Sequence, residues 1–315
     1  MNVHLTFDVE IWCNGWHKLD ERFPACFERY VYGGSPLGDY ALPKTLEILS
    51  RHGLKGVFFV EPLFALRFGK HYLRELVGLI DRAGHDVQLH LHPEWVDEIE
   101  PKLITNVVPK RQYLWAFTLA EQIALISSAK RVLEQALGRP ITVFRAGSYA
   151  ANRDTYTALD RLGIKIDSSL NDCYAVSAPD VPRLAFYQSV QLVGSASCYQ
   201  VTVFRDGFGR LRPMQINGCG FSELRDALLD AQRSGMRHCV VVSHNFEMLK
   251  PGLTDPDPIV VRRFEHFCAW LAINTEHFTV SGFPAVHEPT GPERVPRCGA
   301  LATAQRHALQ LLRRL

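Results

Sequence analysis

The chain of 315 residues is 47% hydrophobic and 22% charged, and its 35 Lys and Arg nearly balance its 33 Asp and Glu, for a net charge of +2. These values are typical of a globular protein and exclude a disordered chain. The balanced charge supplies no basic field for a nucleic-acid backbone, and no stretch reaches the roughly 18 apolar residues of a membrane-spanning helix.

The N-terminus and the cysteines point to the cell compartment. The first ten residues, MNVHLTFDVE, contain no Lys or Arg, so no secretory signal peptide is predicted. The eight cysteines are scattered without a C-x-x-C pair, which favours neither a zinc knuckle nor a disulfide framework. Together these features predict a cytoplasmic protein, with peripheral attachment at the inner face of the membrane as a variant.

Short apolar runs alternate with longer amphipathic stretches, a pattern typical of βα units around a parallel sheet or barrel. Strands are predicted at residues 3–8, 55–60, 86–90, 141–145, 164–167, 238–244 and 278–281. Helices are predicted at residues 43–52, 62–82, 118–137, 221–235 and 258–275. Residues 183–220 are rich in β-branched and aromatic residues with interspersed Gly, which predicts irregular strands or hairpins. The pattern predicts seven or eight parallel strands.

The chain is predicted to form one domain followed by a tail. The domain covers residues 1–284, and residues 285–315 form a Pro/Gly-rich linker and a C-terminal helix, ALATAQRHALQLLRRL. The Arg and Leu content of this helix permits contact with a membrane surface or a partner. Packing against the domain is the favoured prediction.

Polar side chains gather where the predicted strands end. In parallel α/β proteins these ends meet at one rim, which is where ligands bind. The residues there are Asp8, Glu10, His90, His92, Glu94, Arg145 and His244. Two imidazoles two residues apart on a strand point the same way and both reach one divalent ion. Each motif alone has a structural explanation, such as a helix cap, an ion pair or a core histidine, but their convergence favours a hydrolytic metal site.

The residue types at this rim fit metal-assisted hydrolysis. One carboxylate and two neutral imidazoles bind a metal ion and leave one position open for water. A second carboxylate can accept the proton of that water, and an imidazole across the site can protonate a leaving amine. Arg145 beside the base carboxylate would keep that carboxylate ionised.

The motifs, in this order, resemble those of the polysaccharide deacetylase family, the NodB-homology carbohydrate esterases. LTFDVE resembles T-F-D-D-G, GHDVQLHLHPEW resembles G-H-E-I-x-x-H-x-x-x-H, VFRAGSYA resembles R-x-P-Y, and VVVSHN resembles L-x-H. KGVFFV also matches the family strand A-T-F-F-V, and the resemblance covers roughly residues 3–283. It implies an α/β fold, a distorted (β/α) barrel with about seven parallel strands, and metal-dependent removal of acetyl groups from sugars.

The resemblance implies a role for each matched residue. Asp8 takes the place of the general base, His244 that of the general acid, and Arg145 that of the arginine that pairs with the base. Gly147 stands where R-x-P-Y has proline, so the wall of the site is expected to differ from that of typical family members.

The implied metal ligands are Glu10, His90 and His92. Val9 occupies the place of the usual metal-binding aspartate, which moves that ligand to Glu10. The family spacing would put the second histidine at Glu94, so Glu94 is the alternative to His92, which has the shorter H-x-H spacing found in a branch near lipopolysaccharide and capsule genes. Zn²⁺ is the expected ion, with Co²⁺, Ni²⁺ and Mn²⁺ as alternatives.

Aromatic residues on the long connections after the first and third strands fit the recognition of sugar rings. The residues predicted to bind substrate are Trp12, Trp16, Glu94, Trp95 and Tyr149. Anchoring of the loops in the core is the structural alternative for each aromatic ring.

The sequence as a whole predicts a metal-dependent carbohydrate N-deacetylase. Its substrate would be an acetamido sugar in a nucleotide- or lipid-linked glycan precursor. A deformylase or a non-sugar amide hydrolase on the same fold is an alternative, and the altered first and second motifs also leave open a non-catalytic glycan-binding relative. A metal-dependent phosphoesterase is a weaker reading because no Gly-rich phosphate loop is present.

Overall fold

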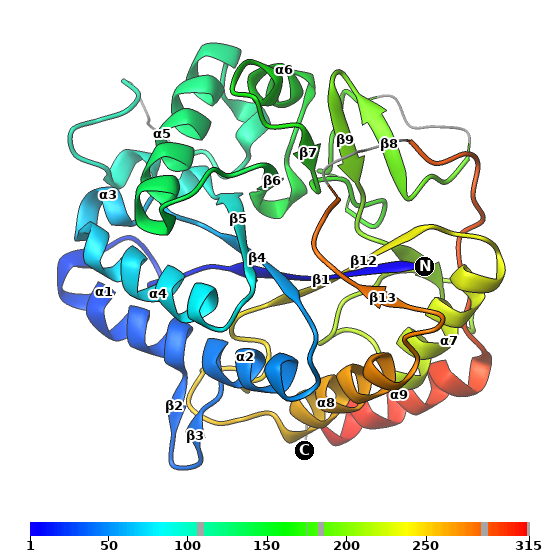
Figure 1. The fold of residues 1–315 in the computed structure, drawn as a ribbon. Coiled ribbons are helices and arrows are strands. Elements are labelled where there is room, and N and C mark those ends of the chain that lie inside the picture. The colour runs from blue at the N-terminus through cyan, green and yellow to red at the C-terminus, as the bar shows by residue number, and fades with distance from the viewer. Residues whose placement is uncertain (106–109, 175, 182–185, 285–288, 314–315) are drawn as a thin grey trace.

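The computed structural model describes residues 1–105, 110–174, 176–181, 186–284 and 289–313. In this part of the chain a nine-stranded sheet lies at the centre and helices surround it (Figure 1). Its strands are β1 (Asn2–Val9), β4 (Gly56–Val60), β5 (Asp86–Leu91), β6 (Val143–Ala146), β7 (Ile166–Asp167), β8 (Val190–Val193), β9 (Ala196–Tyr199), β12 (His238–His244) and β13 (Thr279–Val280). Two short ribbons lie outside it, β2 (Gly34–Ser35) with β3 (Gly38–Asp39) and β10 (Val203–Arg205) with β11 (Leu211–Pro213).

The strand order is β12-β1-β4-β5-β6-β7-β9-β8, and β13 pairs with the beginning of β1. Every neighbouring pair is parallel except β8 and β9. The sheet curls into a half-barrel, and the segment 202–216 lies along the outer edge of β12, where the Thr202 N–H donates to the Val240 carbonyl at 3.0 Å and the Ile216 N–H to the Val242 carbonyl at 3.1 Å. The predicted α/β barrel-like architecture is confirmed.

The helices largely follow the amphipathic pattern of the sequence. They are α1 (Leu19–Phe27), α2 (Leu42–Arg51), α3 (Ala65–Phe68), α4 (Lys70–Arg82), α5 (Leu119–Leu137), α6 (Arg153–Arg161), α7 (Phe221–Arg233), α8 (Pro258–Ile273) and α9 (Ala300–Leu312). A π-helical turn, η1 (Glu28–Tyr32), and three 3₁₀ turns, η2 (Pro93–Glu98), η3 (Leu114–Ala116) and η4 (Gly147–Tyr149), complete the set. A capping box between Thr118 and Glu121 starts α5, because each side chain satisfies a free backbone N–H of the other.

Two predictions about these elements were wrong. The helix expected at 62–82 is broken at Gly69, whose φ of 108° is left-handed backbone, so α3 and α4 are separate. The long connection after β1 was expected to be a loop, but it contains α1 and η1.

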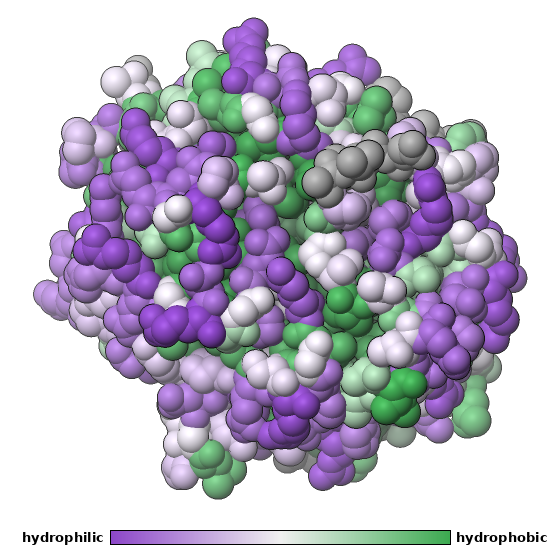
Figure 2. Space-filling view, viewed as in Figure 1, coloured by the Kyte–Doolittle hydropathy of each residue, from purple (hydrophilic) through white to green (hydrophobic). Residues whose placement is uncertain are grey.

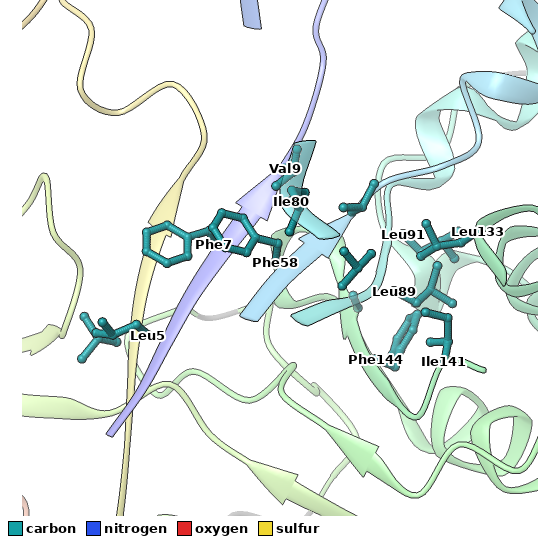
Figure 3. Packing of buried hydrophobic residues seen from close by; sticks show 14 of the residues in the cluster. Leu5, Phe7, Val9, Phe58, Ile80, Leu89, Leu91, Leu133, Ile141 and Phe144 are labelled. Atoms are coloured by element: carbon teal, nitrogen blue, oxygen red, sulfur yellow. The ribbon is translucent and has the colours of Figure 1, made fainter. Parts of the chain in front are cut away.

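The side chains of β1 alternate between two environments because successive residues of a strand point to opposite faces. Leu5, Phe7 and Val9 belong to the large hydrophobic core beneath the helices, where the rings of Phe7 and Phe58 stack at 4.7 Å (Figure 3). Each fully buried side chain of this kind contributes about 1.5–3 kcal/mol. Thr6 and Asp8 are buried on the opposite, inner face.

The strand register brings distant polar residues together at the carboxyl ends. Asp8 in β1 pairs with His244 in β12, and His90 in β5 pairs with Arg145 in β6. Because these residues all lie near the ends of parallel strands, the strand alternation places their side chains around one opening.

The C-terminal helix α9 lies beside α7 (Figure 1). The buried guanidinium of Arg306 in α9 donates from Nε to Glu223 at 2.9 Å and from Nη2 to Asp206 at 3.2 Å. The expected packing of this helix is therefore present. The domain division at residue 284 stays a prediction, because the first linker residues, 285–288, lie outside the described residues.

Hydrophilic side chains dominate the face shown in Figure 2, and hydrophobic ones are visible mainly in recesses between them. Within the described residues, no helix has the length and apolarity that crossing a bilayer requires.

Candidate functional site

A cavity of about 430 Å³ opens at the carboxyl ends of the strands. Its lining includes residues from the ends of β1, β5 and β12, namely Asp8, Glu10, His92 and His244. Trp12, Glu94, Gln112, Ser148, Tyr149 and Tyr174 also face it. The cavity therefore lies at the rim where the sequence placed the site.

Three candidate metal ligands meet at the wall of this cavity. Glu10 Oε1 lies 3.1 Å from His90 Nε2 and 2.9 Å from His92 Nε2, and all three residues are buried. A second group, formed by Asp8, Glu10 and His244, also brings three ligand atoms within 4.8 Å of one another. Glu10 belongs to both groups and lies at the centre of the site.

Hydrogen bonds behind the imidazoles fix which nitrogen faces Glu10. His90 Nδ1 lies 2.8 Å from the backbone carbonyl of Arg145, which can only accept, so Nδ1 carries the hydrogen. His92 Nδ1 lies 3.2 Å from the Glu94 carboxylate, which holds that ring in the same way. In their neutral forms both rings then turn an Nε2 lone pair toward the Glu10 carboxylate. A cation between these three electron-pair donors would stabilise the arrangement, so the residues fit the expected divalent ion.

The pKa values of Glu10 and His92 also indicate that a positive charge beside the Glu10 carboxylate is favourable. Burial favours neutral His92, but the charges and hydrogen bonds of Glu10 and Glu94 outweigh it and raise the pKa of His92 well above its usual range. Burial likewise opposes ionisation of Glu10, yet His92 and His90 hold the pKa of this carboxyl well below its usual range. The site therefore favours an ionised carboxylate balanced by a positive charge.

Gly147 makes room for His92. A Cβ atom built on Gly147 would lie 2.7 Å from three ring atoms of His92, closer than real side chains approach. Gly147 stands where R-x-P-Y has proline. A larger residue there would collide with the imidazole of His92, so the glycine is needed for a histidine at the second position of H-x-H. Glu94, the alternative ligand, lies behind His92 and contacts its Nδ1 atom.

Replacing Gly147 by Ala is expected to lower the affinity for Zn²⁺ by about 10–100-fold, the effect typical of disturbing the support of a ligand. Competition titration against a chelator measures this affinity. Gly218→Ala is the matched control, because the nearest atom to a Cβ there lies 3.7 Å away. Unchanged Zn²⁺ affinity in Gly147→Ala would contradict the assignment of His92 as a ligand.

Arg145 is held immobile beside Asp8. Its Nη1 donates to Asp8 Oδ1 at 2.6 Å, and its Nη2 donates to Thr6 Oγ1 at 3.0 Å and to Ser168 Oγ at 2.9 Å. Its Nε donates to the Ser168 carbonyl at 3.1 Å, and its guanidinium lies 4.1 Å from the centre of the Phe59 ring. These contacts fix the orientation of the guanidinium and of the Asp8 carboxyl that it binds.

His244 has an acidic partner that the sequence analysis did not identify. Its Nδ1 lies 2.8 Å from Glu247 Oε1, and Glu247 also accepts from Ser243 Oγ and Gln215 Nε2 at 2.8 and 2.7 Å. Burial lowers the pKa of His244, but the hydrogen bond to Glu247 and the charges of Glu247, Glu10 and Asp8 raise it to about 9. His244 is therefore protonated at neutral pH and can donate a proton from Nε2.

Asn245 is a second residue that the sequence analysis missed. Its Oδ1 accepts from the Glu10 backbone N–H at 3.0 Å, and its Nδ2 donates to the Tyr30 carbonyl at 2.6 Å. This side chain therefore positions the backbone of the candidate ligand Glu10. Asn245 directly follows His244 in the VVVSHN motif. This adjacency is the only feature of the sequence that could have indicated a role for Asn245 in the site.

The predicted substrate residues occupy different places. Trp12 lines the cavity, donates from Nε1 to Glu10 Oε2 at 2.8 Å and meets the His92 ring edge-on. Tyr149 also lines the cavity, in left-handed backbone with a φ of 57°. Trp16 lines a neighbouring cavity. Trp95 is only 1% exposed and packs in the core, so its prediction as a substrate contact was wrong.

Comparison with known proteins finds a family similarity in the central part of the chain. Residues 35–166 match the family model described as polysaccharide deacetylase, which confirms the resemblance of the sequence motifs. The matched segment includes His90, His92 and Arg145. No curated protein matches the sequence significantly.

The structure is similar to that of a putative polysaccharide deacetylase from Mycobacterium smegmatis, with 19% identity, a TM-score of 0.57, and coverage of 89% of this chain and 86% of that chain. This similarity shows a common fold. A family 4 carbohydrate esterase from Streptomyces lividans in complex with acetate is 13% identical over 94% of this chain and 97% of that chain, with a TM-score of 0.47. A CE4 family pseudoenzyme from Bacillus anthracis is 14% identical over 88% and 62% of the two chains, with a TM-score of 0.42.

Proposed function

We propose that this protein, whose central segment is that of a polysaccharide deacetylase, is a metal-dependent N-deacetylase that acts on an acetamido sugar. The observation that carries the proposal is the meeting of three groups at one cavity. These groups are the Glu10–His90–His92 cluster, the Asp8–Arg145 pair and the His244–Glu247 pair. They provide a metal site, a base and an acid for hydrolysis of an amide.

Glu10, His90 and His92 would hold the ion. When bound, a divalent cation supplies Lewis-acid chemistry, which draws electron density from the acyl carbonyl and makes water more acidic. Asp8 accepts the proton of the attacking water, because Arg145 Nη1 donates to one of its carboxyl oxygens at 2.6 Å and holds the carboxyl in place. His244 then donates its Nε2 proton to the nitrogen as the C–N bond breaks. The amide and water become acetate and the free amine of the sugar.

Replacing Glu247 by Gln is expected to move the alkaline limb of the kcat profile to lower pH by about 1–2 units, because a hydrogen bond to a charged group contributes roughly 1.5–3 kcal/mol. The acid must be protonated, so activity falls as the pH rises through the pKa of His244, which burial lowers but Glu247, Glu10 and Asp8 together raise to about 9. Acetate release between pH 6 and 10 measures this limb. Glu276→Gln, at an exposed carboxylate, should leave it in place. An unshifted limb in Glu247→Gln would argue against His244 as the acid.

The proposal is tested with purified protein, by elemental analysis and by acetate release from acetamido sugars. We expect about one equivalent of Zn²⁺, loss of activity on chelation, recovery with added Zn²⁺, and loss of both metal and activity in His90→Ala. Full activity in His90→Ala or after complete removal of the metal would overturn the metal-dependent mechanism. Formamido sugars in the same assay test the deformylase alternative, and absence of all hydrolysis by the metal-loaded protein would favour the non-catalytic one.

The finer parts of the hypothesis remain predictions from the sequence. These are the cytoplasmic location, a role in lipopolysaccharide biosynthesis, Zn²⁺ as the ion, and the nucleotide- or lipid-linked form of the sugar. Contact of the C-terminal helix with a membrane or a partner is not needed to explain its burial, since α9 already packs against α7.

A further inference from the structure

A cavity of about 270 Å³ lies among the helices that surround the sheet, and residues of α7, α8 and α9 line it. We call it the helical cavity, and these three helices lie together in Figure 1. None of its lining residues lines the catalytic cavity. The helical cavity is therefore a separate space with a chemistry of its own.

The side chains that give the helical cavity its charge are basic. Arg262, Arg263 and His266 come from α8 and Arg306 comes from α9, and no carboxylate is found in the described part of the lining. Arg306 is balanced by its two buried carboxylate partners. Arg262 is exposed and makes no ion pair within the described residues. The cavity therefore favours a negatively charged ligand.

Arg263 presents unpartnered donors although it is only 4% exposed. Its Nη1 donates to the carbonyls of Ile216 and Asn217 at 2.7 and 2.9 Å. Its Nε is buried without a hydrogen-bond partner, and its Nη2 donates to none of the described residues. Nε and Nη2 form the edge with which an arginine binds a carboxylate through two parallel hydrogen bonds. A carboxylate in the helical cavity would satisfy both donors.

The N-terminus of α7 lies at the same cavity and is a second feature that favours an anion. Gly220, Phe221 and Ser222 all line it. Gly220 is the N-cap and has no side chain that could accept from the first-turn N–H groups, and Glu223 takes only the N–H of Gly220, at 2.9 Å. The free N–H groups and the dipole of this 13-residue helix add to the positive potential.

The rest of the lining is largely apolar. Phe221, Ile259, Ala302 and Leu309 face the cavity beside the basic groups. An inorganic anion would use the basic groups alone, whereas a ligand with an apolar body and one acidic group would use both kinds of surface. The volume is slightly below the roughly 300–1,000 Å³ typical of ligand sites, so such a ligand must be small.

We propose that the helical cavity binds a small organic carboxylate with an apolar body. Its carboxylate pairs with Nε and Nη2 of Arg263, with Arg262 as a second positive charge, and its apolar body packs on Phe221, Ile259 and Leu309. Such a ligand contacts α7, α8 and α9 together and so strengthens the attachment of α9 to the barrel. The inference goes beyond the proposed function and does not depend on it.

The test is calorimetric titration of the full chain with three probes. Hexanoate carries both the charge and the apolar chain, hexanamide carries the chain without the charge, and acetate carries the charge with a single methyl group. We expect hexanoate to bind at least 10-fold more tightly than either and to raise Tm. Equal affinity for hexanamide would show that the basic groups contribute nothing, and equal affinity for acetate that the apolar lining contributes nothing. Either result, or no binding of hexanoate, would overturn the inference.

Variants locate the binding of hexanoate. Arg263→Lys keeps the positive charge but removes the two-donor edge, so affinity should fall at least 10-fold. Arg262→Gln, at an exposed residue, should lower it at least 3-fold. Arg233→Gln is the matched control, because this side chain is 67% exposed in the last turn of α7, away from the cavity, and should keep the affinity. Unchanged affinity in Arg263→Lys would overturn the assignment.

Arg263 also holds two backbone carbonyls, so circular dichroism checks the folding of Arg263→Lys. If that variant does not fold, Arg262→Gln decides, and unchanged affinity in it overturns the assignment. A carboxylate is also a ligand for the divalent ion expected at the catalytic site. The same titration is therefore repeated with His90→Ala, which should bind hexanoate as the wild type does. Loss of hexanoate binding in folded His90→Ala would place the probe in the catalytic cavity and overturn the inference.

Discussion

Replacing Asp8 by Asn is expected to lower kcat by roughly 10²–10⁴-fold while Zn²⁺ stays bound. The amide has nearly the same shape and can still accept from Arg145 Nη1, but it cannot accept the proton of water. The three candidate ligands, Glu10, His90 and His92, are unchanged in this variant. Acetate release and metal content, measured on the same sample, separate the loss of the base from the loss of the ion.

The Asp8→Asn experiment needs a control for folding, because the variant leaves the buried charge of Arg145 without its counter-ion. Activity is therefore measured below the unfolding temperature of the variant, with circular dichroism in parallel. Asp226→Asn, at a more exposed carboxylate of α7, should keep wild-type kcat. An Asp8→Asn protein that retains more than a tenth of wild-type kcat would show that another group is the base.

Replacing Arg306 by Met is expected to lower the free energy of unfolding by about 3–5 kcal/mol, the cost typical of breaking a buried ion pair. Arg306 is 3% exposed, and its two carboxylate partners, Glu223 and Asp206, have fully buried side chains. Met fills much of the same space as Arg. The decrease in the free energy of unfolding therefore comes mainly from leaving the Glu223 and Asp206 carboxylates unpaired. Denaturation by urea measures the change.

Arg294→Met is the matched control in the same part of the chain. Arg294 pairs with Asp230 at 2.8 Å, but its side chain is 48% exposed, so its loss should cost about 0–1 kcal/mol. A change below 1 kcal/mol in Arg306→Met would mean that α9 contributes little to the stability of the fold.

The candidate site could be predicted from the sequence because side chains two residues apart on a strand point to the same face, whatever the rest of the fold is. Asp8 and Glu10 share one face of their strand and its extension, as His90 and His92 do, so their spacing alone predicts that they point the same way. Their actual meeting depends on register, which the structure supplies through the pairing of Asp8 with His244. Zn²⁺ and the individual roles remain predictions.

The supporting residues could not be found in this way. Thr6 and Ser168 reach Arg145 from two different strand regions, and Glu247 reaches His244 through the turn after β12. Such contacts depend on three-dimensional placement and leave no periodic pattern. The burial of Trp95 could not be predicted for a related reason, because an aromatic residue next to a motif at the strand ends can equally turn into the core.

The one antiparallel pair of the main sheet also has a local cause. Only Gly194 and Ser195 separate β8 from β9, and a two-residue connection can join antiparallel strands but cannot form a parallel crossover. Gly194 has a φ of 59°, which suits such a tight turn. The composition of this region indicated hairpins, but it did not indicate that one would extend the central sheet.

The pairing of Asp8 with His244 has a consequence for the way the protein becomes active. The proposed base lies on β1 and the proposed acid on β12, so nearly the whole intervening chain must be placed before the two meet. Contacts between such distant segments form slowly, because a long loop must close first. A chain that has not yet docked β12 lacks the acid, Glu247 and one wall of the cavity. The proposed site is therefore assembled late in folding, and we expect no hydrolysis from a partly synthesised chain that has not yet docked β12.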